Sequence, residues 1–332
     1  MIRQFIKKQF LGYSLPQEYA CLALEDLIDR LRVVLTVKGS RSSLDVSTTH
    51  LFLGYKPLII GIPVDTLSEF YSHLNSEGEI CLSFHEKDSE PSMNWRGFPA
   101  FKESIARIIL KKTHSLACGD NTLFVFEGKY AKHEFIGNIN QFINRQREKR
   151  RIDRKVNINL SDNLADQVQA AYSIPRIISI ITLVDNEKMN MFPTDLHGPV
   201  GNNFYVGSLR HGGKANEQVE KLKRIAVSRV DVTWCKQAYS LGKNHMQELK
   251  DINCFSTSTT GSSNFNIPLP EAVSFYHELE QLDSIELGIH RIHSYSVVST
   301  LKTTNAKTLS HVHRFYAQWR LNNGKSTKFY WR

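Results

Sequence analysis

Residues 190–198 read Asn190-Met191-Phe192-Pro193-Thr194-Asp195-Leu196-His197-Gly198. This stretch lies between two short runs, Ile181-Thr182-Leu183 and Phe204-Tyr205-Val206-Gly207. Runs of β-branched and aromatic residues favour strands, so the pattern predicts a strand, a polar segment and a second strand.

The same layout occurs 146 positions earlier. There, Leu35-Thr36-Val37 leads through Ser47-Thr48-Thr49-His50 to Leu58-Ile59-Ile60-Gly61. Three pairs of identical residues keep this spacing: Thr36 with Thr182, Thr48 with Thr194, and Gly61 with Gly207. A repeat of this length predicts two related halves and an internal duplication, with chance similarity as the alternative.

Bulk properties fit a two-domain globular protein. The chain has 332 residues and 38.1 kDa, with 41% hydrophobic and 23% charged residues. Its five cysteines are scattered without a C-x-x-C pair, which favours a reducing compartment over disulfides or a zinc–cysteine site. The longest strongly apolar stretch, 177–183, is too short to span a bilayer, and basic residues interrupt the apolar start of the chain. We therefore expect a cytoplasmic protein with no secretory signal and no membrane contact.

The formal net charge of +9 is concentrated in one segment. Residues 145–155 contain seven basic and two acidic side chains, without aromatic residues between them for base stacking. A solvated linker or helix end is the favoured interpretation, so nucleic-acid binding is not expected. A basic surface that collects phosphorylated ligands is the weaker alternative.

Local patterns predict individual elements. Helical spacing or capping favours helices that begin at Pro16 and Pro270, whereas 33–37 and 225–230 read as strands. Asn323-Gly324 favours a tight hairpin near the C-terminus. Many short strands, no regular βαβ alternation and no G-x-G-x-x-G motif predict a mainly β fold built of barrels.

Polar and basic residues gather where the second repeat would bind an anion. Residues 208–214, Ser208-Leu209-Arg210-His211-Gly212-Gly213-Lys214, precede a predicted helix. Hydroxyl groups, backbone amides at a helix start and cationic side chains are the components of a phosphate site. A polar loop with a glycine turn is the alternative interpretation.

The layout resembles the flavin reductase-like, FMN-binding split-barrel family. In that family an Asn-x-Met-Thr-x-Ser-Trp-type segment follows the first strands, and the next strand leads to a phosphate-contacting stretch and a helix. Asn190, Met191, Thr194 and Asp195 stand at the first segment; Ser208, Arg210 and Lys214 stand near the second. A Leu-x-Ala-Gly-Asp-His-Thr-Leu-Phe-like strand entry is resembled closely by residues 116–124 and loosely by 287–292.

Three departures bear on what the resemblance implies. Leu196-His197 replaces the Ser-Trp pair, and residues 199–203 lack the usual Pro-Pro. In the first half Asp65 stands at the expected phosphate position, where its charge would repel the ligand. The resemblance therefore implies two tandem split β-barrels, of which the second is the candidate for flavin.

The expected domains are a first barrel at 1–140, a basic helical linker at 141–172 and a second barrel at 173–332. Because the family usually forms dimers with FMN at the interface, the chain is expected to form its own pseudo-dimer, with a further homodimer as an option. The expected cofactor-binding residues are Asn190, Met191, Pro193, Thr194, Asp195, His197, Ser208, Arg210, His211 and Lys214.

The resemblance implies an FMN-dependent oxidoreductase that moves electrons between NADH or NADPH and flavin or another acceptor. Flavin chemistry demands no protein nucleophile, so no catalytic residue is assigned. The alternative is a non-enzymatic binding or interaction protein that kept the barrels and lost the flavin. His290-x-x-His293 and His311-x-His313 invite a metal site, but no third ligand is indicated and structural histidines are favoured.

Overall fold

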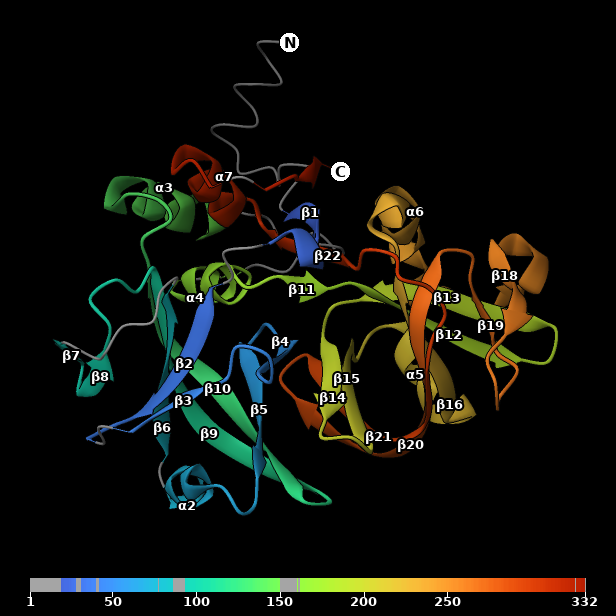
Figure 1. The fold of residues 1–332 in the computed structure, drawn as a ribbon, viewed down its shortest axis with the longest axis horizontal. Helices are drawn as coiled ribbons and strands as arrows, with labels where there is room; N and C mark the ends of the chain where they lie inside the picture. The colour runs from blue at the N-terminus through green and yellow to red at the C-terminus, as the bar shows by residue number, and fades with distance from the viewer. Residues whose placement is uncertain are drawn as a thin grey trace, which may run out of the picture.

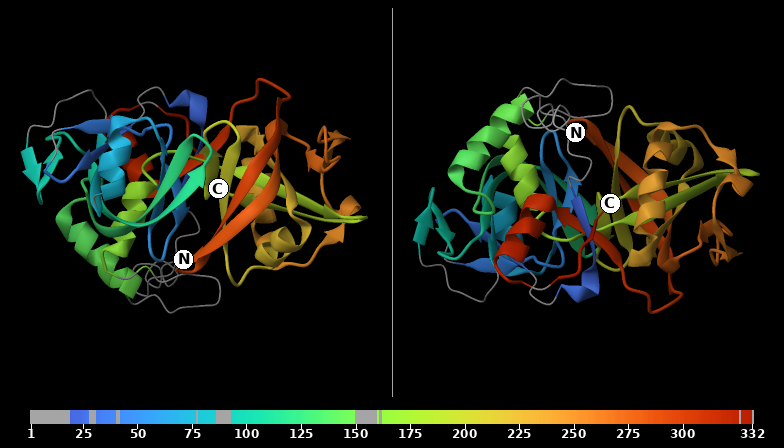
Figure 2. Two further views of the ribbon diagram at one scale, coloured as in Figure 1. Left: turned by 90° about the horizontal axis from the view of Figure 1, so that it is seen from below. Right: turned by 90° about the horizontal axis from the view of Figure 1, so that it is seen from above.

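The computed structural model describes residues 19–27, 31–39, 42–76, 78–85, 93–149, 160, 162–325 and 327–331. Two large β-sheets lie side by side, the first coloured blue to green and the second yellow to orange (Figure 1). Views from below and above show the same arrangement (Figure 2). The mainly β fold expected from the sequence is confirmed.

The first sheet has seven antiparallel strands. Their order is β3 (Ser43–Asp45), β2 (Arg32–Val37), β6 (Glu79–His85), β9 (Ala106–Cys118), β10 (Asn121–His133), β5 (Ile59–Asp65) and β4 (Leu51–Gly54). Helix α2 (Glu69–Ser76) connects β5 to β6. Strand β2 is buried after its first residue, which explains its nearly continuous β-branched and apolar sequence.

The second sheet has eight strands. Their order is β14 (His197–Val200), β15 (Phe204–Arg210), β21 (His290–Lys302), β20 (Val273–Leu287), β16 (Arg224–Val230), β12 (Ser179–Asp185), β13 (Lys188–Thr194) and β17 (Lys250–Asp251). Apart from β17, this is the order of the first sheet, taken from its other end. Helix α5 (Lys214–Leu222) connects β15 to β16, as α2 connects β5 to β6. The two halves therefore follow the same path through space.

Gly61 and Gly207, which are 146 positions apart, hold matching places in the two sheets. Gly61 of β5 pairs with Leu51, the first residue of β4, and on its other side with β10. Gly207 of β15 pairs with His197, the first residue of β14, and on its other side with β21. The spacing seen in the sequence thus corresponds to one position in a shared topology.

A third sheet joins the two ends of the described chain. Its order is β11 (Arg176–Ile177), β22 (Leu309–His313), β1 (Tyr19–Ala23) and β23 (Tyr330–Trp331). Two further pairs are small: β7 (Met93–Trp95) with β8 (Phe98–Ala100), and β18 (Thr257–Gly261) with β19 (Pro268–Pro270).

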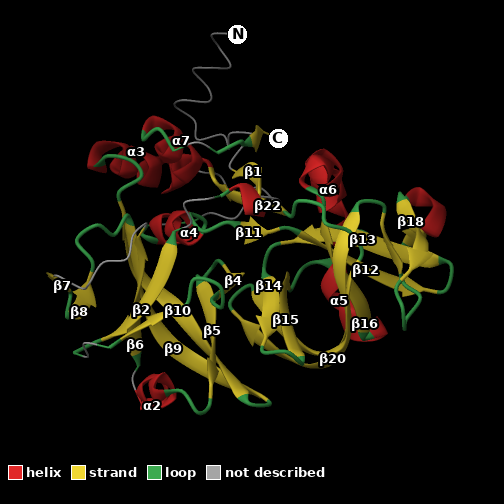
Figure 3. Cartoon of the chain, viewed as in Figure 1, coloured by secondary structure: helices red, strands yellow, loops and turns green. Residues whose placement is uncertain are grey.

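The remaining helices cover the edges of the sheets, with α3, α4 and α7 gathered beside the first one (Figure 3). The α-helices are α3 (Asn138–Lys149), α4 (Leu164–Ala171), α6 (Cys235–Ser240) and α7 (Arg314–Asn322). The 3₁₀ helices are η1 (Leu24–Asp26), η2 (Val232–Trp234), η3 (Leu241–Met246) and η4 (Ile252–Cys254). None of the helices within the described ranges is long and apolar enough to cross a membrane.

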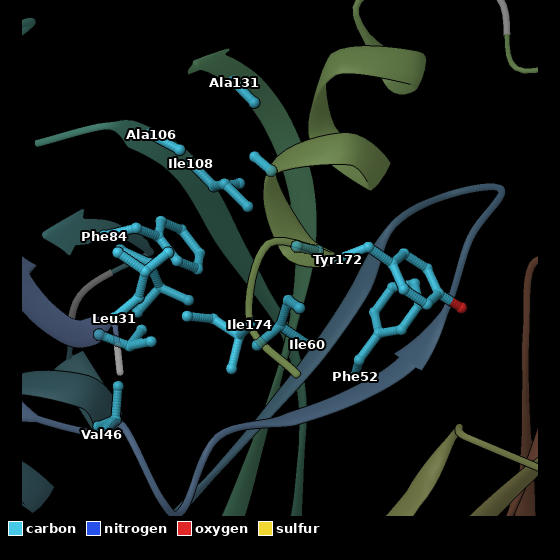
Figure 4. Packing of buried hydrophobic residues seen from close by; sticks show 14 of the residues in the cluster. Leu31, Val46, Phe52, Ile60, Phe84, Ala106, Ile108, Ala131, Tyr172 and Ile174 are labelled. Atoms are coloured by element: carbon cyan, nitrogen blue, oxygen red, sulfur yellow. The ribbon is translucent and has the colours of Figure 1, made fainter. Parts of the chain in front are cut away.

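The largest apolar core fills the first half and continues under α4 and α7. Figure 4 shows part of it, including Phe52, Phe84 and Tyr172. Tyr316 and Ala317 of α7 belong to the same cluster, so the C-terminal helix completes the core of the first half.

Matching strands of the two halves meet in a separate apolar cluster. Leu51, Leu53 and Val125 come from the first sheet, and Val206 and Ile292 come from the second. These residues lie on β4 and β10 in the first half and on β15 and β21 in the second half, and β10 and β21 are equivalent strands of the two sheets. Apolar burial at this contact holds the halves together.

Three local predictions were wrong. Pro270 ends strand β19 and the stretch after it is strand β20, not a helix. The segment before Asn323-Gly324 is helix α7 and not a hairpin arm. Residues 19–23 form strand β1 where a helix was expected to continue from Pro16, which itself lies outside the described residues. Most of the basic segment 145–155 also lies outside them.

Candidate functional site

A cleft of about 530 Å³ opens between the two halves. Three connections and the strand residues next to them form most of it: the turn between β3 and β4, the connection from α4 to β11, and the turn between β13 and β14. Its lining residues are Leu24, Leu31, Arg32, Asp45, Ser47, Thr48, His50, Leu51, Ile174, Pro175, Arg176, Ile177, Asp195, His197, Gly198, Pro199, Tyr205 and Arg229. The turns β3–β4 and β13–β14 are the equivalent segments of the two repeats. The two halves therefore line the cleft with the same turn of a shared topology.

The turn after β3 is held by short-range hydrogen bonds. The Ser47 hydroxyl donates to Asp45 Oδ1 at 2.5 Å and accepts from the backbone amide of Val33 at 2.9 Å. His50 Nδ1 donates to the carbonyl of Val46 at 2.7 Å. Both oxygens of Asp45 are engaged, because Oδ2 pairs with Arg32 at 2.7 Å. This turn therefore presents the side chains of Thr48 and His50 from a fixed backbone.

Three arginines line the cleft against two aspartates, so its wall carries an excess of positive charge. Arg32 is paired with Asp45. Arg176 is buried; one of its terminal nitrogens donates to the carbonyl of Ala171 at 2.9 Å, and its guanidinium lies 5.2 Å from the ring centre of Phe52. Burial lowers the pKa of Arg176 to about 10, so it stays charged at neutral pH.

Arg229 differs from Arg32 because no carboxylate pairs with it in the described part of the chain, and from the buried Arg176 because it is partly exposed. Its guanidinium lies 4.6 Å from the centre of the Phe275 ring. The positive charge of Arg229 helps to lower the pKa of His197 and of His277, which places this charge close to the second-half wall of the cleft. An arginine without an acidic partner is available to a ligand anion.

Asp195 is the second carboxylate of the cleft. Its Oδ2 accepts hydrogen bonds from the Tyr172 hydroxyl at 2.7 Å and from His311 Nε2 at 2.8 Å. Burial alone would raise the pKa of Asp195, but the hydrogen bond and charge of His311, the Tyr172 hydroxyl and Arg176 together lower it. Asp195 is therefore a carboxylate at neutral pH.

The two histidines of the cleft are neutral at physiological pH. Burial lowers the pKa of His50 to about 3, and the charge of Arg176 acts in the same direction. Burial lowers the pKa of His197 to about 4, and the nearby Asp195 only partly opposes this. His197 Nδ1 is 2.5 Å from the Tyr205 hydroxyl. Both rings thus offer uncharged hydrogen-bonding groups.

Two of the ten residues expected to bind the cofactor, Asp195 and His197, line the cleft. Asn190 and Met191 are buried behind it in β13, where the Asn190 amide bonds to Gln218 at 2.7 Å. Pro193 and Thr194 end the same strand, and Thr194 Oγ1 accepts from the backbone amide of Leu196 at 3.3 Å.

The residues of the expected phosphate cradle do not line the cleft. Ser208 is buried with its hydroxyl 3.3 Å from His290 Nδ1. Lys214 pairs with Glu217 at 3.0 Å and with Glu248 at 3.1 Å.

Arg210 and His211 lie at the far end of β15, and His211 Nδ1 is 3.6 Å from Glu286. The Ser208 hydroxyl and the side chains of His211 and Lys214 are thus engaged in contacts within the protein.

Sequence reasoning missed the three arginines of the cleft. Arg32, Arg176 and Arg229 come from three strands, β2, β11 and β16, and none follows a glycine-rich turn or opens a helix. Their common location is visible only once the sheets are assembled. No local pattern could have found them.

The histidine pairs singled out in the sequence make internal contacts. His290 approaches Ser208, and His293 bonds to Gln281 at 3.0 Å and to Asn216 at 2.8 Å. Among the described residues no three His, Cys, Asp or Glu side chains are grouped so as to hold a metal ion.

Solved structures similar to this chain include FMN-binding proteins and flavin reductases. An FMN-binding protein from Thermus thermophilus with bound p-hydroxybenzaldehyde is 16% identical, with a TM-score of 0.36 over 40% of this chain and 74% of that one. The flavin reductase PheA2 is 11% identical, with a TM-score of 0.38 over 52% of this chain and 98% of that one. The styrene monooxygenase flavin reductase from Pseudomonas putida S12 is 12% identical, with a TM-score of 0.37 over 49% and 95%. No protein-family model and no curated protein matches the chain.

The lining of the cleft is compatible with a ligand that carries a phosphate and a flat ring, as FMN does. Its volume lies within the roughly 300–1,000 Å³ typical of small-molecule sites. Apolar side chains suited to a flat ring alternate with charged ones: Leu24, Leu31, Leu51, Ile174, Pro175, Ile177 and Pro199. Arg176 and Arg229 suit a phosphate, and Asp195 suits a hydrogen-bond donor of the ligand. The residues present therefore fit the cofactor.

Proposed function

We propose that this protein is an FMN-binding oxidoreductase of the flavin reductase-like class, with its cofactor in the cleft between the two halves. NADH or NADPH is the proposed electron donor, and flavin or another small molecule is the acceptor. The observation that carries the proposal is a cleft formed by equivalent turns of two repeated barrels and lined by three arginines.

The chain supplies binding and orientation in this proposal. Arg229 and Arg176, which both line the cleft, hold the phosphate; the apolar residues of both turns flank the ring; and His50 and His197 meet its polar edges. A bound flavin supplies the electron transfer itself, which is why no protein nucleophile is required. Burial of the cleft floor strengthens each charged contact because the local dielectric is low.

The duplicated topology has a role in the same proposal. The first barrel (1–140) and the second (173–332), joined by residues 141–172, act as an intrachain pseudo-dimer that arose by internal duplication. Each half contributes one turn to the cleft, so neither forms it alone. We place the protein in the cytoplasm, where its five free cysteines remain reduced.

A second candidate function is a binding or interaction protein that has lost flavin chemistry. The commitment of Lys214 to Glu217 and Glu248, and of Ser208 to His290, favours it. In this case the cleft binds a different small anion, and no electron transfer takes place.

Titration with FMN tests the proposal directly. Purified protein is mixed with FMN, and flavin fluorescence and the visible spectrum are followed. Saturable quenching with a shifted absorbance band is expected, followed by faster oxidation of NADH or NADPH when FMN is present. Quenching without faster oxidation would show a flavin-binding protein without reductase activity. The absence of both would overturn flavin binding and favour the binding-protein alternative.

A further inference from the structure

Asp195 has one carboxylate oxygen that the protein itself does not use. Oδ2 accepts from both Tyr172 and His311. Oδ1 has no hydrogen-bond partner in the described ranges, and the side chain, which is 20% exposed, lines the cleft. The other carboxylate of the cleft, Asp45, has both oxygens occupied, by Arg32 and Ser47. Asp195 is therefore the carboxylate with an acceptor left for a ligand.

The two donors to Oδ2 are themselves fixed. Tyr172 packs edge-on against Phe52 with 4.8 Å between ring centres, and Figure 4 shows its hydroxyl pointing away from the apolar cluster. His311 is buried on β22 and stacks on Tyr19 with 4.7 Å between ring centres. The packing of Tyr172 on Phe52 and of His311 on Tyr19 thus fixes the positions from which these two donors hold Oδ2.

The proton arrangement on His311 follows from its partners. A carboxylate can only accept, so His311 Nε2 carries the hydrogen that points to Asp195. His311 Nδ1 lies 2.8 Å from the Tyr239 hydroxyl of α6, which donates to it when the ring is neutral. Tyr239 thus holds one nitrogen of the His311 ring, the other nitrogen holds Oδ2 of the carboxylate, and Oδ1 is directed to the cleft.

We infer that Asp195 Oδ1 accepts a hydrogen bond from the imide N–H of the bound flavin ring, and that it orients the ring while the phosphate pairs with Arg229. The inference rests on the proposed function. The imide N3–H is the only N–H of the oxidised isoalloxazine ring, so it is the ring group that a carboxylate oxygen recognises. The ligand class is an anion that also carries an imide or amide N–H.

An asparagine at this position would reverse the polarity that the ligand meets. In Asp195→Asn the amide oxygen must face Tyr172 and His311, because both donate. The amide NH₂ is then left facing the cleft, where it opposes the flavin N3–H donor to donor. The shape of the site is kept while one acceptor becomes a donor.

The test compares the affinities of FMN and 3-methyl-FMN, measured by fluorescence quenching, so it does not depend on turnover. The unaltered protein should bind FMN at least about tenfold more tightly than the methylated ligand, which lacks the N3–H. Asp195→Asn should bind FMN about tenfold more weakly and should lose the discrimination. Asp45→Asn changes the carboxylate whose oxygens both have partners within the protein, so it should keep the discrimination between the two ligands.

Tyr172→Phe is the second variant. It keeps the aromatic ring and removes the Tyr172 hydroxyl, which is one of the two donors that position Asp195. Its discrimination should fall between those of the unaltered protein and Asp195→Asn. Equal binding of both ligands by the unaltered protein overturns the inference, as does full discrimination in every folded variant at residues 172 and 195. Failure of the unaltered protein to bind either ligand instead overturns the proposed function.

Discussion

Gly288, in the turn between β20 and β21, lies directly against the backbone of Lys56 in the turn between β4 and β5. A Cβ atom on Gly288 would lie 2.5 Å from the carbonyl oxygen of Lys56, and the next amide, Ile289, donates to that oxygen at 3.3 Å. Gly288 also has a φ of +60°, which favours glycine. The contact joins a turn of the second half to a turn of the first.

Gly288→Ala should therefore destabilise the whole protein. A side chain would strain the backbone and push the two turns apart, which together should cost about 1–3 kcal/mol or more of unfolding free energy. Urea unfolding followed by circular dichroism measures this. Gly242→Ala is the matched control, because nothing lies within 4 Å of a Cβ there, and it should change stability by under about 1 kcal/mol. Equal stability of the two variants would show that the turns do not depend on this contact.

Arg229 and Arg210 offer a direct comparison between the cleft and the cradle expected from sequence. If the phosphate lies in the cleft, Arg229→Ala should weaken FMN binding by about 1.5–3 kcal/mol, as loss of a charge-assisted hydrogen bond does. Arg210→Ala should leave affinity unchanged, because Arg210 does not line the cleft. Fluorescence titration of both variants measures the difference.

Riboflavin, which lacks the phosphate, is the ligand control for this pair. The unaltered protein should prefer FMN to riboflavin, and Arg229→Ala should lose most of that preference. If Arg210→Ala loses it instead, the phosphate lies at the end of β15, where the sequence placed it.

Glu278 should stabilise the loop that folds around it. Its buried carboxylate accepts from the Ser262 hydroxyl at 2.6 Å, the Phe265 amide at 2.6 Å and the Ser299 hydroxyl at 2.5 Å. Burial alone would raise the pKa of Glu278, but these hydrogen bonds lower it to about 2. A depressed carboxylate pKa contributes stability above about pH 4.5, which is lost as the pH falls towards 2.

Glu278→Gln should accordingly lower the unfolding free energy at pH 7 by about 2 kcal/mol or more, because several donors lose a charged acceptor. It should also flatten the acid dependence between about pH 4.5 and 2. Glu280→Gln is the control: Glu280 makes an exposed ion pair with Arg224, which is worth under about 1 kcal/mol. An unchanged acid profile in Glu278→Gln would contradict the assignment.

Buried histidines should make the fold sensitive to mild acid. Burial lowers the pKa of His313 to about 3 and those of His290 and His293 to about 4. The unfolded chain binds protons near pH 6.5 while the folded protein does not, so stability is present above about pH 6.5 and falls as the pH drops towards 4. Urea unfolding at pH 7.5 and pH 5 should show the loss.

His293→Gln should reduce this slope by about 1.4 kcal/mol per pH unit between pH 6.5 and 4, which corresponds to one proton. His73→Gln, on the exposed surface of α2, should leave the slope as it is. A slope that does not change in His293→Gln would mean that this ring is already protonated in the folded protein.

The repeat and the strands were predictable from sequence, whereas several other elements were not. Runs such as 33–37 and 225–230 became β2 and β16 because burial on both faces requires continuous β-branched residues. Strand β20 was missed because irregularities in its pairing after Glu278 and Gln281 break the alternation and leave helix-like spacing. Asn323-Gly324 ends α7, since a residue with positive φ suits a helix end as well as a hairpin.

The candidate site was predictable only where a local segment carried it. Asp195 and His197 lie in the polar stretch 190–198 that follows a predicted strand, and both line the cleft. Arg176, Arg229 and His311 come from distant strands and act through their assembled positions. Residue type and spacing indicate residues that lie together in one segment of the sequence. They do not indicate residues that only the folded chain brings together.

The sheet that pairs β1 with β22 and β23 has a consequence for synthesis. Strand β1 finds its neighbours only when residues 309–331 have been made, and the same C-terminal stretch supplies Tyr316 and Ala317 to the core of the first half. Until the last part of the chain is made, strand β1 has no partner strands and the core of the first half is incomplete. We expect nascent chains to stay dependent on chaperones until translation is nearly complete, even though the first half contains a barrel of its own.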